Sequence, residues 1–316
     1  MRIVTIAAND AGQRLDKFLS KLMPTAPKGM LYKLIRKKDI RLNGARCRGD
    51  EQLQVGDTVR IFAKEEFFTK PEKPHFSTKA QGKITPVYED GDLLIVDKPS
   101  GMYAHGGQDG AVSLLDEILC YLSAKGEYDP SAEQTFAPAL CNRIDRNTEG
   151  LVIAAKNAAA LRCMNEAIRE RKVQKQYIAI TATPLPERHA LCTAYQKKDE
   201  RTRQVSVRSN AADSTWKRIV TEYEVLARSG DRQLVKVTLH TGRTHQIRAH
   251  LAFLGAPLLG DPKYGSGADK EENQCLCAWS LRFTGLQNTV LSGLEGMEVH
   301  TPLPEFVRRY FPDVRL

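Results

Sequence analysis

The sequence predicts a two-domain chain that contains both helices and strands. Residues 1–63 carry two short helical patterns followed by a hairpin turn, which indicates a small N-terminal unit. Residues 64–83 are rich in lysine, glutamate and proline and have no sustained hydrophobic period, as is typical of a linker. Residues 84–316 then carry several strand-like segments and one clear helical pattern, so we expect the larger domain to contain a sheet.

The composition favours a polyanionic partner. The 316 residues have room for one domain of about 200 residues and a smaller one. A formal net charge of +9 favours nucleic acid over a membrane surface. The seven cysteines include no C-x-x-C pair, so neither a disulfide framework nor a zinc ribbon is expected, and Cys275 and Cys277 are predicted to be buried thiols. Without an apolar stretch of about 18 residues or a signal-peptide pattern, we expect a cytoplasmic protein that binds no membrane.

The N-terminal unit is predicted to begin with two short amphipathic helices, over residues 13–22 and 29–38. A strand over residues 40–42 then turns at Asn43-Gly44, which is a strong hairpin signal. Residues 55–61 alternate as a further strand. The order of these elements, with the stretches R-L-D-K-F-L, I-R-L-N-G and V-G-D-T-V, resembles the S4 RNA-binding module.

The second predicted helix and the hairpin after it carry a run of basic residues. Residues 28–48 include eight lysines and arginines and a single acidic residue, Asp39. A solvated helix face is one interpretation of such a run. The resemblance to the S4 module implies instead that the helix follows an RNA backbone, which gives salt-dependent affinity without a choice of sequence. The residues that we expect to contact RNA are Lys33, Arg36, Lys37, Lys38 and Arg41.

The most informative stretch of the larger domain covers residues 141–155. Polar, turn-prone residues around Asp145 lead through Gly150 into an apolar run, which predicts a junction between a loop and a strand. Such a junction holds a side chain at the edge of a sheet and leaves it open to solvent, where catalytic groups are often placed. A surface carboxylate paired with Arg143 or Arg146 is the alternative interpretation of Asp145.

The chain after this stretch is predicted to form a helix over residues 157–172 and a strand over residues 173–180. Residues 181–215 are polar and contain two prolines, so we expect them to form loops over the RNA face. Paired strands are expected over residues 217–227 and 234–239.

The second informative stretch covers residues 239–251. It contains His240, His245 and His250 at intervals of five residues. This spacing does not bring three imidazoles onto one face of a helix, and no cysteine or carboxylate ligands accompany them. We therefore expect no metal site here.

Three separated motifs resemble, in the same order, those of the RluA-type pseudouridine synthases of the ribosomal large subunit. The stretch R-I-D-R-N-T-E-G-L is similar to the family's H-R-L-D-x-x-T-S-G-L, with Asn142, Ile144 and Glu149 in place of His, Leu and Ser. Residues 175–177 match the K-x-Y motif, and residues 241–250 match T-G-R-T-H-Q-I-R-x-H. The resemblance covers most of the chain, including the N-terminal S4 domain.

The resemblance implies an α+β catalytic domain built on a mixed, largely antiparallel sheet. It implies that Asp145 is the catalytic carboxylate, that Arg248 pairs with it and that Tyr177 lies against the uridine. Ile247 is expected to pack beside the target base. Residues 259–265 are similar to the family's L-G-D-x-x-Y-G and also fit a simple turn. The other residues that the motifs assign to substrate binding are Arg143, Arg243, His245 and Gln246.

The implied function is the isomerisation of specific uridines to pseudouridine, in 23S ribosomal RNA or alternatively in transfer RNA. This reaction needs no cofactor and no metal, and we expect the protein to act as a monomer. A glycosidase that uses Asp145 and Glu149 as a carboxylate pair is a rival, which the low aromatic content of 7% disfavours. A catalytically silent S4-type RNA-binding or ribosome-assembly factor is another.

Overall fold

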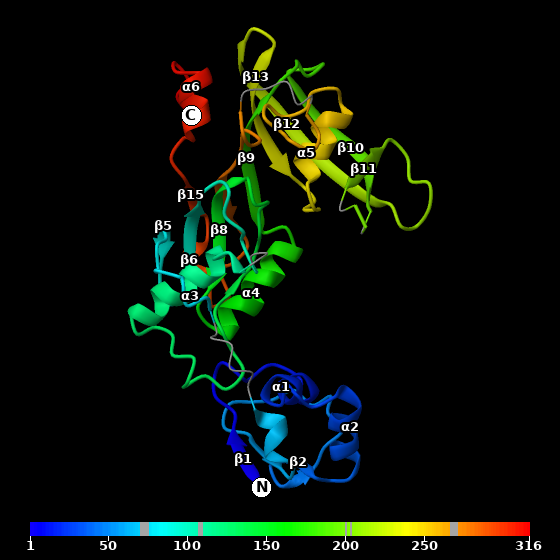
Figure 1. Ribbon diagram of the computed structural model, residues 1–316, viewed down its shortest axis with the longest axis vertical. Helices are drawn as coiled ribbons and strands as arrows, with labels where there is room; N and C mark the ends of the chain where they lie inside the picture. The colour runs from blue at the N-terminus through cyan, green and yellow to red at the C-terminus, as the bar shows by residue number, and fades with distance from the viewer. Residues whose placement is uncertain (70–75, 107–109, 200, 203, 266–270) are drawn as a thin grey trace.

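The computed structural model describes residues 1–69, 76–106, 110–199, 201–202, 204–265 and 271–316. It contains two separate sheets, one near the N-terminus and a much larger one that extends along the rest of the molecule (Figure 1). Of the predicted linker 64–83, residues 70–75 lie outside the described residues. No helix in the described ranges is long and apolar enough to cross a membrane.

The N-terminal sheet is antiparallel and has two helices packed on it. Its strands, in sheet order, are β1 (Arg2–Thr5), β4 (Thr58–Ile61), β2 (Ile40–Leu42) and β3 (Ala45–Arg46), and its helices are α1 (Leu15–Leu22) and α2 (Lys28–Arg36). Both predicted helices and the predicted hairpin are confirmed. Asn43 and Gly44 both have positive φ, of 51° and 79°, as a two-residue hairpin turn requires. The strand predicted over residues 55–61 begins only at Thr58, because the preceding residues form a turn.

The N-terminal unit has its own hydrophobic core. The described residues of the predicted linker, on either side of residues 70–75, contact the two units. The 3-10 helix η1 (Glu65–Phe68) buries Phe68 in the N-terminal core. Beyond residues 70–75, the backbone N–H groups of Gln81 and Lys83 donate to the Glu117 carboxylate of the following helix. A hydrogen bond of 3.0 Å from the Arg162 guanidinium to the Ala11 carbonyl joins the N-terminal unit to the larger one.

The larger sheet has eleven strands and is mixed, because β8 and β14 pair in parallel whereas the other described pairs are antiparallel. The predicted fold class is therefore confirmed. The order along the sheet is β11 (Val205–Arg208), β10 (His189–Lys198), β12 (Lys217–Ser229), β13 (Arg232–Leu239), β9 (Val173–Thr181), β14 (Leu276–Phe283), β8 (Glu149–Ala155), β6 (Leu93–Lys98) and β5 (Pro86–Glu89), with β15 (Glu298–His300) beside β14 and β7 (Ala139–Leu140) beside β8.

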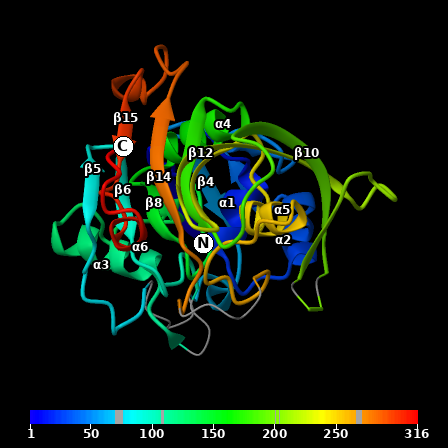
Figure 2. The ribbon, with the colours of Figure 1, turned by 90° about the horizontal axis from the view of Figure 1, so that it is seen from above.

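Helices cover both faces of this sheet because its central strands are apolar on both sides. Leu94 and Val96 of β6 face helix α3 (Leu114–Ala124), whereas Leu93 and Ile95 face helix α4 (Ala158–Arg169). Helix α5 (Gln246–Phe253) lies within the curve formed by β10 and β12 (Figure 2). Helix α6 (Glu305–Tyr310) packs through Val307 against residues of β9 and β13. The 3-10 helix η3 (Ser292–Leu294) precedes β15.

The predicted helix over residues 157–172 and the predicted strands around it are confirmed within a few residues. The Asn157 side chain accepts a hydrogen bond from the backbone N–H of Ala160 and so caps α4. Cys275 and Cys277 are buried, as expected.

The prediction that residues 181–215 form loops is wrong for residues 189–198 and 205–208, which are strands, and residues 200 and 203 lie outside the described residues. β10 and β11 form an antiparallel hairpin, and β10 pairs with β12 from His189 to Gln196. Most side chains of β10 remain at least partly exposed, so its sequence HALCTAYQKK mixes polar and apolar residues although the strand pairs with a neighbour on each side.

At Gly150, β8 approaches the backbone of β14 too closely for a side chain. The φ of Gly150 is +111°, and an added Cβ would lie 2.3 Å from the carbonyl oxygen of Ala278. We expect Gly150→Ala to lower the free energy of unfolding by about 3 kcal/mol or more, because both the conformation and the close approach are forbidden to alanine. Urea unfolding measures this loss. Gly91→Ala is the control, since no atom lies within 4 Å of its Cβ position; equal stability of the two variants would contradict the prediction.

Candidate active site

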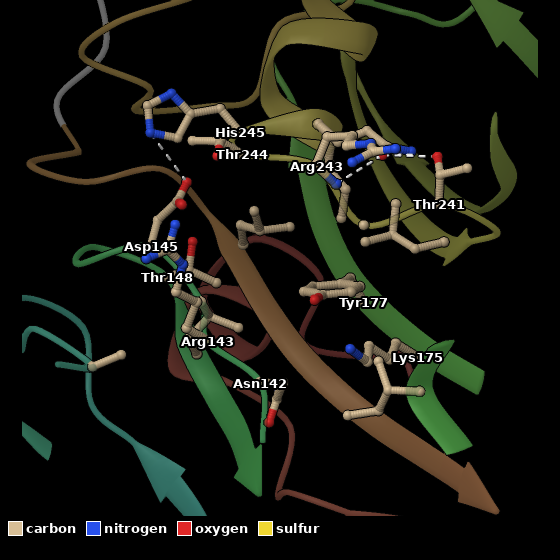
Figure 3. Close-up of a pocket in the computed structure, with 18 of the residues that line it drawn as sticks. Asn142, Arg143, Asp145, Thr148, Lys175, Tyr177, Thr241, Arg243, Thr244 and His245 are labelled. Atoms are coloured by element: carbon tan, nitrogen blue, oxygen red, sulfur yellow. Dashed lines mark hydrogen bonds and ion pairs between the residues drawn. The ribbon is translucent and has the colours of Figure 1, made fainter. Parts of the chain in front are cut away.

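A cavity of about 700 Å³ opens where the loop before β8, the strand β9 and the loop before α5 meet (Figure 3). The eight residues that the sequence predicted for catalysis and substrate binding all line it: Arg143, Asp145, Tyr177, Arg243, His245, Gln246, Ile247 and Arg248. The five predicted RNA-binding residues lie elsewhere, on α2 and in the segment from its end through β2, and all are exposed: Lys33, Arg36, Lys37, Lys38 and Arg41.

One carboxylate oxygen of Asp145 accepts a hydrogen bond from the protein, and the other is available to a substrate. Its Oδ2 accepts a hydrogen bond of 2.9 Å from Nη1 of Arg248, so the ion pair that the resemblance implied is present. Within the described parts of the chain, its Oδ1 accepts no hydrogen bond from protein. The side chain is 25% exposed, which places a carboxylate oxygen within reach of a bound substrate.

Arg248 is fixed from behind by a second carboxylate. Its Nε and Nη2 donate to both oxygens of Asp261 at 2.8 and 2.9 Å, a bidentate pair that is almost fully buried. Burial alone would raise the pKa of Asp261, but the hydrogen bonds and charge of Arg248 outweigh it and lower this pKa. The backbone N–H groups of Lys263 and Tyr264 also donate to Asp261. Arg248 is therefore a rigid cation that presents only Nη1 to Asp145.

His245 lies beside this pair in a left-handed conformation with φ of 53°. Its Nδ1 is 2.9 Å from the Tyr264 hydroxyl, which also accepts a hydrogen bond of 3.2 Å from the backbone N–H of Val205 on β11. Its Nε2 lies 3.8 Å from Oδ2 of Asp145. Burial lowers the pKa of His245 and outweighs the opposing effect of Asp145, so the imidazole is neutral at neutral pH.

Tyr177 and Ile247 supply the apolar part of the cavity. Tyr177 lies on β9 across the cavity from Asp145 (Figure 3), and both Tyr177 and Ile247 are buried in the main hydrophobic core. Burial, with the nearby charge of Asp145, raises the pKa of Tyr177, so its hydroxyl remains protonated. A flat ring next to a carboxylate suits a flipped base whose sugar faces that carboxylate.

The side-chain amide of Gln246 is already hydrogen-bonded to other protein groups. Its Nε2 donates to the Val220 carbonyl and to the Thr221 hydroxyl, at 3.1 and 3.0 Å. Its Oε1 accepts from the Thr241 hydroxyl and from the Arg243 backbone N–H, at 2.9 and 3.1 Å. All four hydrogen-bonding positions of the amide are therefore used to fix the loop before α5, and its role in substrate binding stays a prediction.

Two residues to which sequence reasoning assigned no part in the site also position the Asp145 loop. Lys98 is fully buried, and its ammonium donates to the carbonyls of Pro99, Met102 and Arg146 at 2.8, 2.9 and 3.0 Å. Burial lowers the pKa of Lys98 to about 8. Asn142, which replaces the family's histidine, accepts from the backbone N–H of Ile153 at 2.8 Å and so fixes the start of the loop to β8.

The rival glycosidase pair is not assembled. Glu149 does not line the cavity that contains Asp145. Burial and the charge of Asp97 raise the pKa of Glu149 at the start of β8. Among the described residues no cluster of three or more histidine, cysteine, aspartate or glutamate side chains could hold a metal ion.

The fold is that of the RNA pseudouridylate synthases. The human protein RNA Pseudouridylate Synthase Domain Containing 1 superimposes with a TM-score of 0.58 over 73% of this chain and 87% of that one, at 24% identity. Human RNA Pseudouridylate Synthase Domain Containing 4 gives 0.57 over 70% of this chain and 89% of that one, at 23% identity.

Sequence relatives identify the family. Residues 92–253 match the model of the RNA pseudouridylate synthase family. The chain is 32% identical to ribosomal large subunit pseudouridine synthase C of Salmonella typhimurium, over 87% of this chain and 82% of the relative. It is 30% identical to the protein of that name from Escherichia coli K12, over 100% and 97%. The chain belongs to the RNA pseudouridylate synthase family, as its motifs predicted.

Proposed function

We propose that this protein converts uridine to pseudouridine in ribosomal RNA of the large subunit, with Asp145 as the catalytic carboxylate. The charge of the cavity carries this proposal. Among its described lining residues Asp145 is the only carboxylate, and six cations line the same cavity: Arg143, Arg146, Arg171, Lys175, Arg243 and Arg248. Such a cavity attracts a polyanion, and Asp145 is the anionic group available for catalysis.

The reaction breaks the bond between N1 and C1′, turns the base, joins C5 to C1′ and releases the C5 proton. Arg248 orients Asp145, because its Nη1 donates a charge-assisted hydrogen bond of 2.9 Å to Oδ2 of the carboxylate. The open Oδ1 of Asp145 is the atom that acts at the sugar. The protonated hydroxyl of Tyr177 lies across the cavity, where it can take part in proton movement at the base.

The target uridine must leave its stack to enter this cavity. Flipping a nucleotide costs about a few kcal/mol, which contact of the base with Tyr177 and Ile247 partly offsets. The large ribosomal subunit is the substrate named for the relatives from Salmonella and Escherichia coli, and this supports the choice of RNA. We expect the protein to act in the cytoplasm as a monomer.

Chromatography of digested nucleosides tests the choice of RNA. Incubation with an unmodified transcript of large-subunit ribosomal RNA is expected to yield pseudouridine, and transfer RNA transcripts none. Conversion of transfer RNA alone would contradict the proposed substrate. Conversion of neither, with RNA still bound, would point to a silent RNA-binding factor.

We also propose that the N-terminal unit is an S4-like module, residues 1–63, that binds RNA through the basic side of α2. Lys33→Gln with Arg36→Gln is expected to weaken RNA binding and to reduce the slope of log Kd against log salt concentration by about 0.7–0.9 for each phosphate that the variant no longer neutralises. Filter binding at several salt concentrations measures this slope. Lys17→Gln with Lys21→Gln, which removes the same charge from α1, is the control. Equal slopes for both double variants would contradict the S4 assignment.

A further inference from the structure

The cavity continues past Tyr177 into a second basic end. Figure 3 shows Tyr177 between Asp145 and Lys175, which lies two residues earlier on the same face of β9. Cys141, Val173 and Arg171 also line the cavity. Val173 precedes Lys175 by two residues on the same face of β9, and Arg171 lies two residues before Val173, so the chain direction carries Arg171 further from Tyr177. Nothing in the chemistry at Asp145 uses these side chains, yet two of them are cations.

Arg171 occupies a backbone position that normally takes glycine. It follows the C-cap of α4 and has φ of +61°. The backbone N–H of Arg171 donates to the Ile168 carbonyl and that of Lys172 to the Ala167 carbonyl, at 3.2 and 2.8 Å. This is the Schellman motif, in which a left-handed residue ends the helix and glycine is preferred. An arginine in this conformation loses stability relative to glycine, which points to a use for its side chain.

Lys38 shows the same arrangement at the end of α2, with φ of 67° and the backbone N–H of Asp39 bonded to the Leu34 carbonyl. Lys38 belongs to the basic surface that we assign to RNA binding. A basic residue therefore replaces glycine at two helix ends, one on that surface and one at the cavity.

Neither Arg171 nor Lys175 has a carboxylate partner among the residues that the structure describes. Burial lowers the pKa of Lys175. Its titratable neighbour Cys141 cannot serve as a counter-ion, because burial raises the pKa of that thiol to about 12 and keeps it neutral. Lys175 is half-buried and Arg171 is exposed. A half-buried cation that has no carboxylate partner favours binding of an anion beside it.

We propose that Arg171 and Lys175 form a phosphate-binding subsite at the end of the cavity away from Asp145, which holds the phosphodiester of a nucleotide adjacent to the target uridine. This proposal rests on the proposed function, since it places the same RNA strand along the cavity from Asp145 past Tyr177. The subsite fixes the path along which the strand passes the catalytic carboxylate.

Arg171→Gly is a selective test, because it removes the guanidinium and gives the backbone its preferred residue. We expect it to raise the Kd for an unmodified large-subunit ribosomal RNA transcript about tenfold, as the loss of one charge-assisted hydrogen bond does. The salt slope falls by about 0.7, as expected for one phosphate of single-stranded RNA. The thermal unfolding midpoint does not fall. Lys175→Gln is expected to change Kd and the salt slope in the same direction.

Arg169→Gln is the matched control: it removes the same charge from the last turn of the same helix, but Arg169 does not line the cavity. We expect its Kd to stay within twofold of the unsubstituted protein. Unchanged Kd and slope in both Arg171→Gly and Lys175→Gln would overturn the subsite, and so would an equal loss in Arg169→Gln. These readouts need no turnover, so they are separate from failure of the proposed function, in which the unsubstituted protein binds RNA but forms no pseudouridine.

Discussion

Asp145→Asn is expected to reduce the rate of pseudouridine formation by about 10³-fold or more, while the Kd for RNA changes less than threefold. Asparagine has nearly the same shape but no charge, so it cannot act at the sugar. The surrounding cations that bind phosphate remain in place. Single-turnover conversion of a ribosomal RNA transcript measures the rate, and filter binding measures Kd.

Asp213→Asn is the control for this substitution, because Asp213 is an exposed carboxylate that does not line the cavity. We expect it to convert RNA at the rate of the unsubstituted protein. Turnover by Asp145→Asn within tenfold of that rate would remove Asp145 from the catalytic role, whatever its place beside Arg248.

Asp261→Ala is expected to lower the free energy of unfolding by about 3–5 kcal/mol, because it leaves the buried guanidinium of Arg248 without its bidentate partner. The pKa of Asp261 is lowered in the folded state, so this stabilisation is present at neutral pH and is lost as the pH falls below about 3.9 and through the folded-state pKa. Urea unfolding at pH 7 measures the difference. Pseudouridine formation is expected to fall as well, since Arg248 no longer fixes Asp145.

The double variant Asp261→Ala with Arg248→Met separates charge burial from packing. Removing both charges is expected to recover most of the lost stability but none of the activity. Asp231→Ala, in an exposed turn, controls for the loss of a carboxylate. A stability of Asp261→Ala equal to that of the unsubstituted protein would show that the buried pair does not hold Arg248 in place.

The local fold was predictable where the hydrophobic period was strong. The helices α1 and α4 and the strands β9, β12 and β13 were all indicated by apolar spacing, and the Asn43-Gly44 turn by its residues. The strand β10 was not, because it is held by backbone pairing to β12 while most of its side chains are partly or fully exposed. Spacing along the chain carries no information about such pairing.

The site was predictable where a motif names the residue, and not where its role comes from packing between distant segments. Asp145 and Arg248 were indicated by their motifs. Asp261 lies in the stretch that is similar to L-G-D-x-x-Y-G and also fits a turn, but no role was assigned to it, although it is the residue that holds Arg248. Arg171 had no local signal other than its position after a helix, where the absence of glycine becomes informative only once φ is known.

Release of tritium from RNA labelled at C5 of uridine tests the central claim most directly, because forming the bond between C5 and C1′ expels the hydrogen at C5. We expect the unsubstituted protein to release tritium from unmodified large-subunit ribosomal RNA and Asp145→Asn to release none above background. Release by both proteins, or by neither in a preparation that binds the RNA, would contradict uridine isomerisation at Asp145.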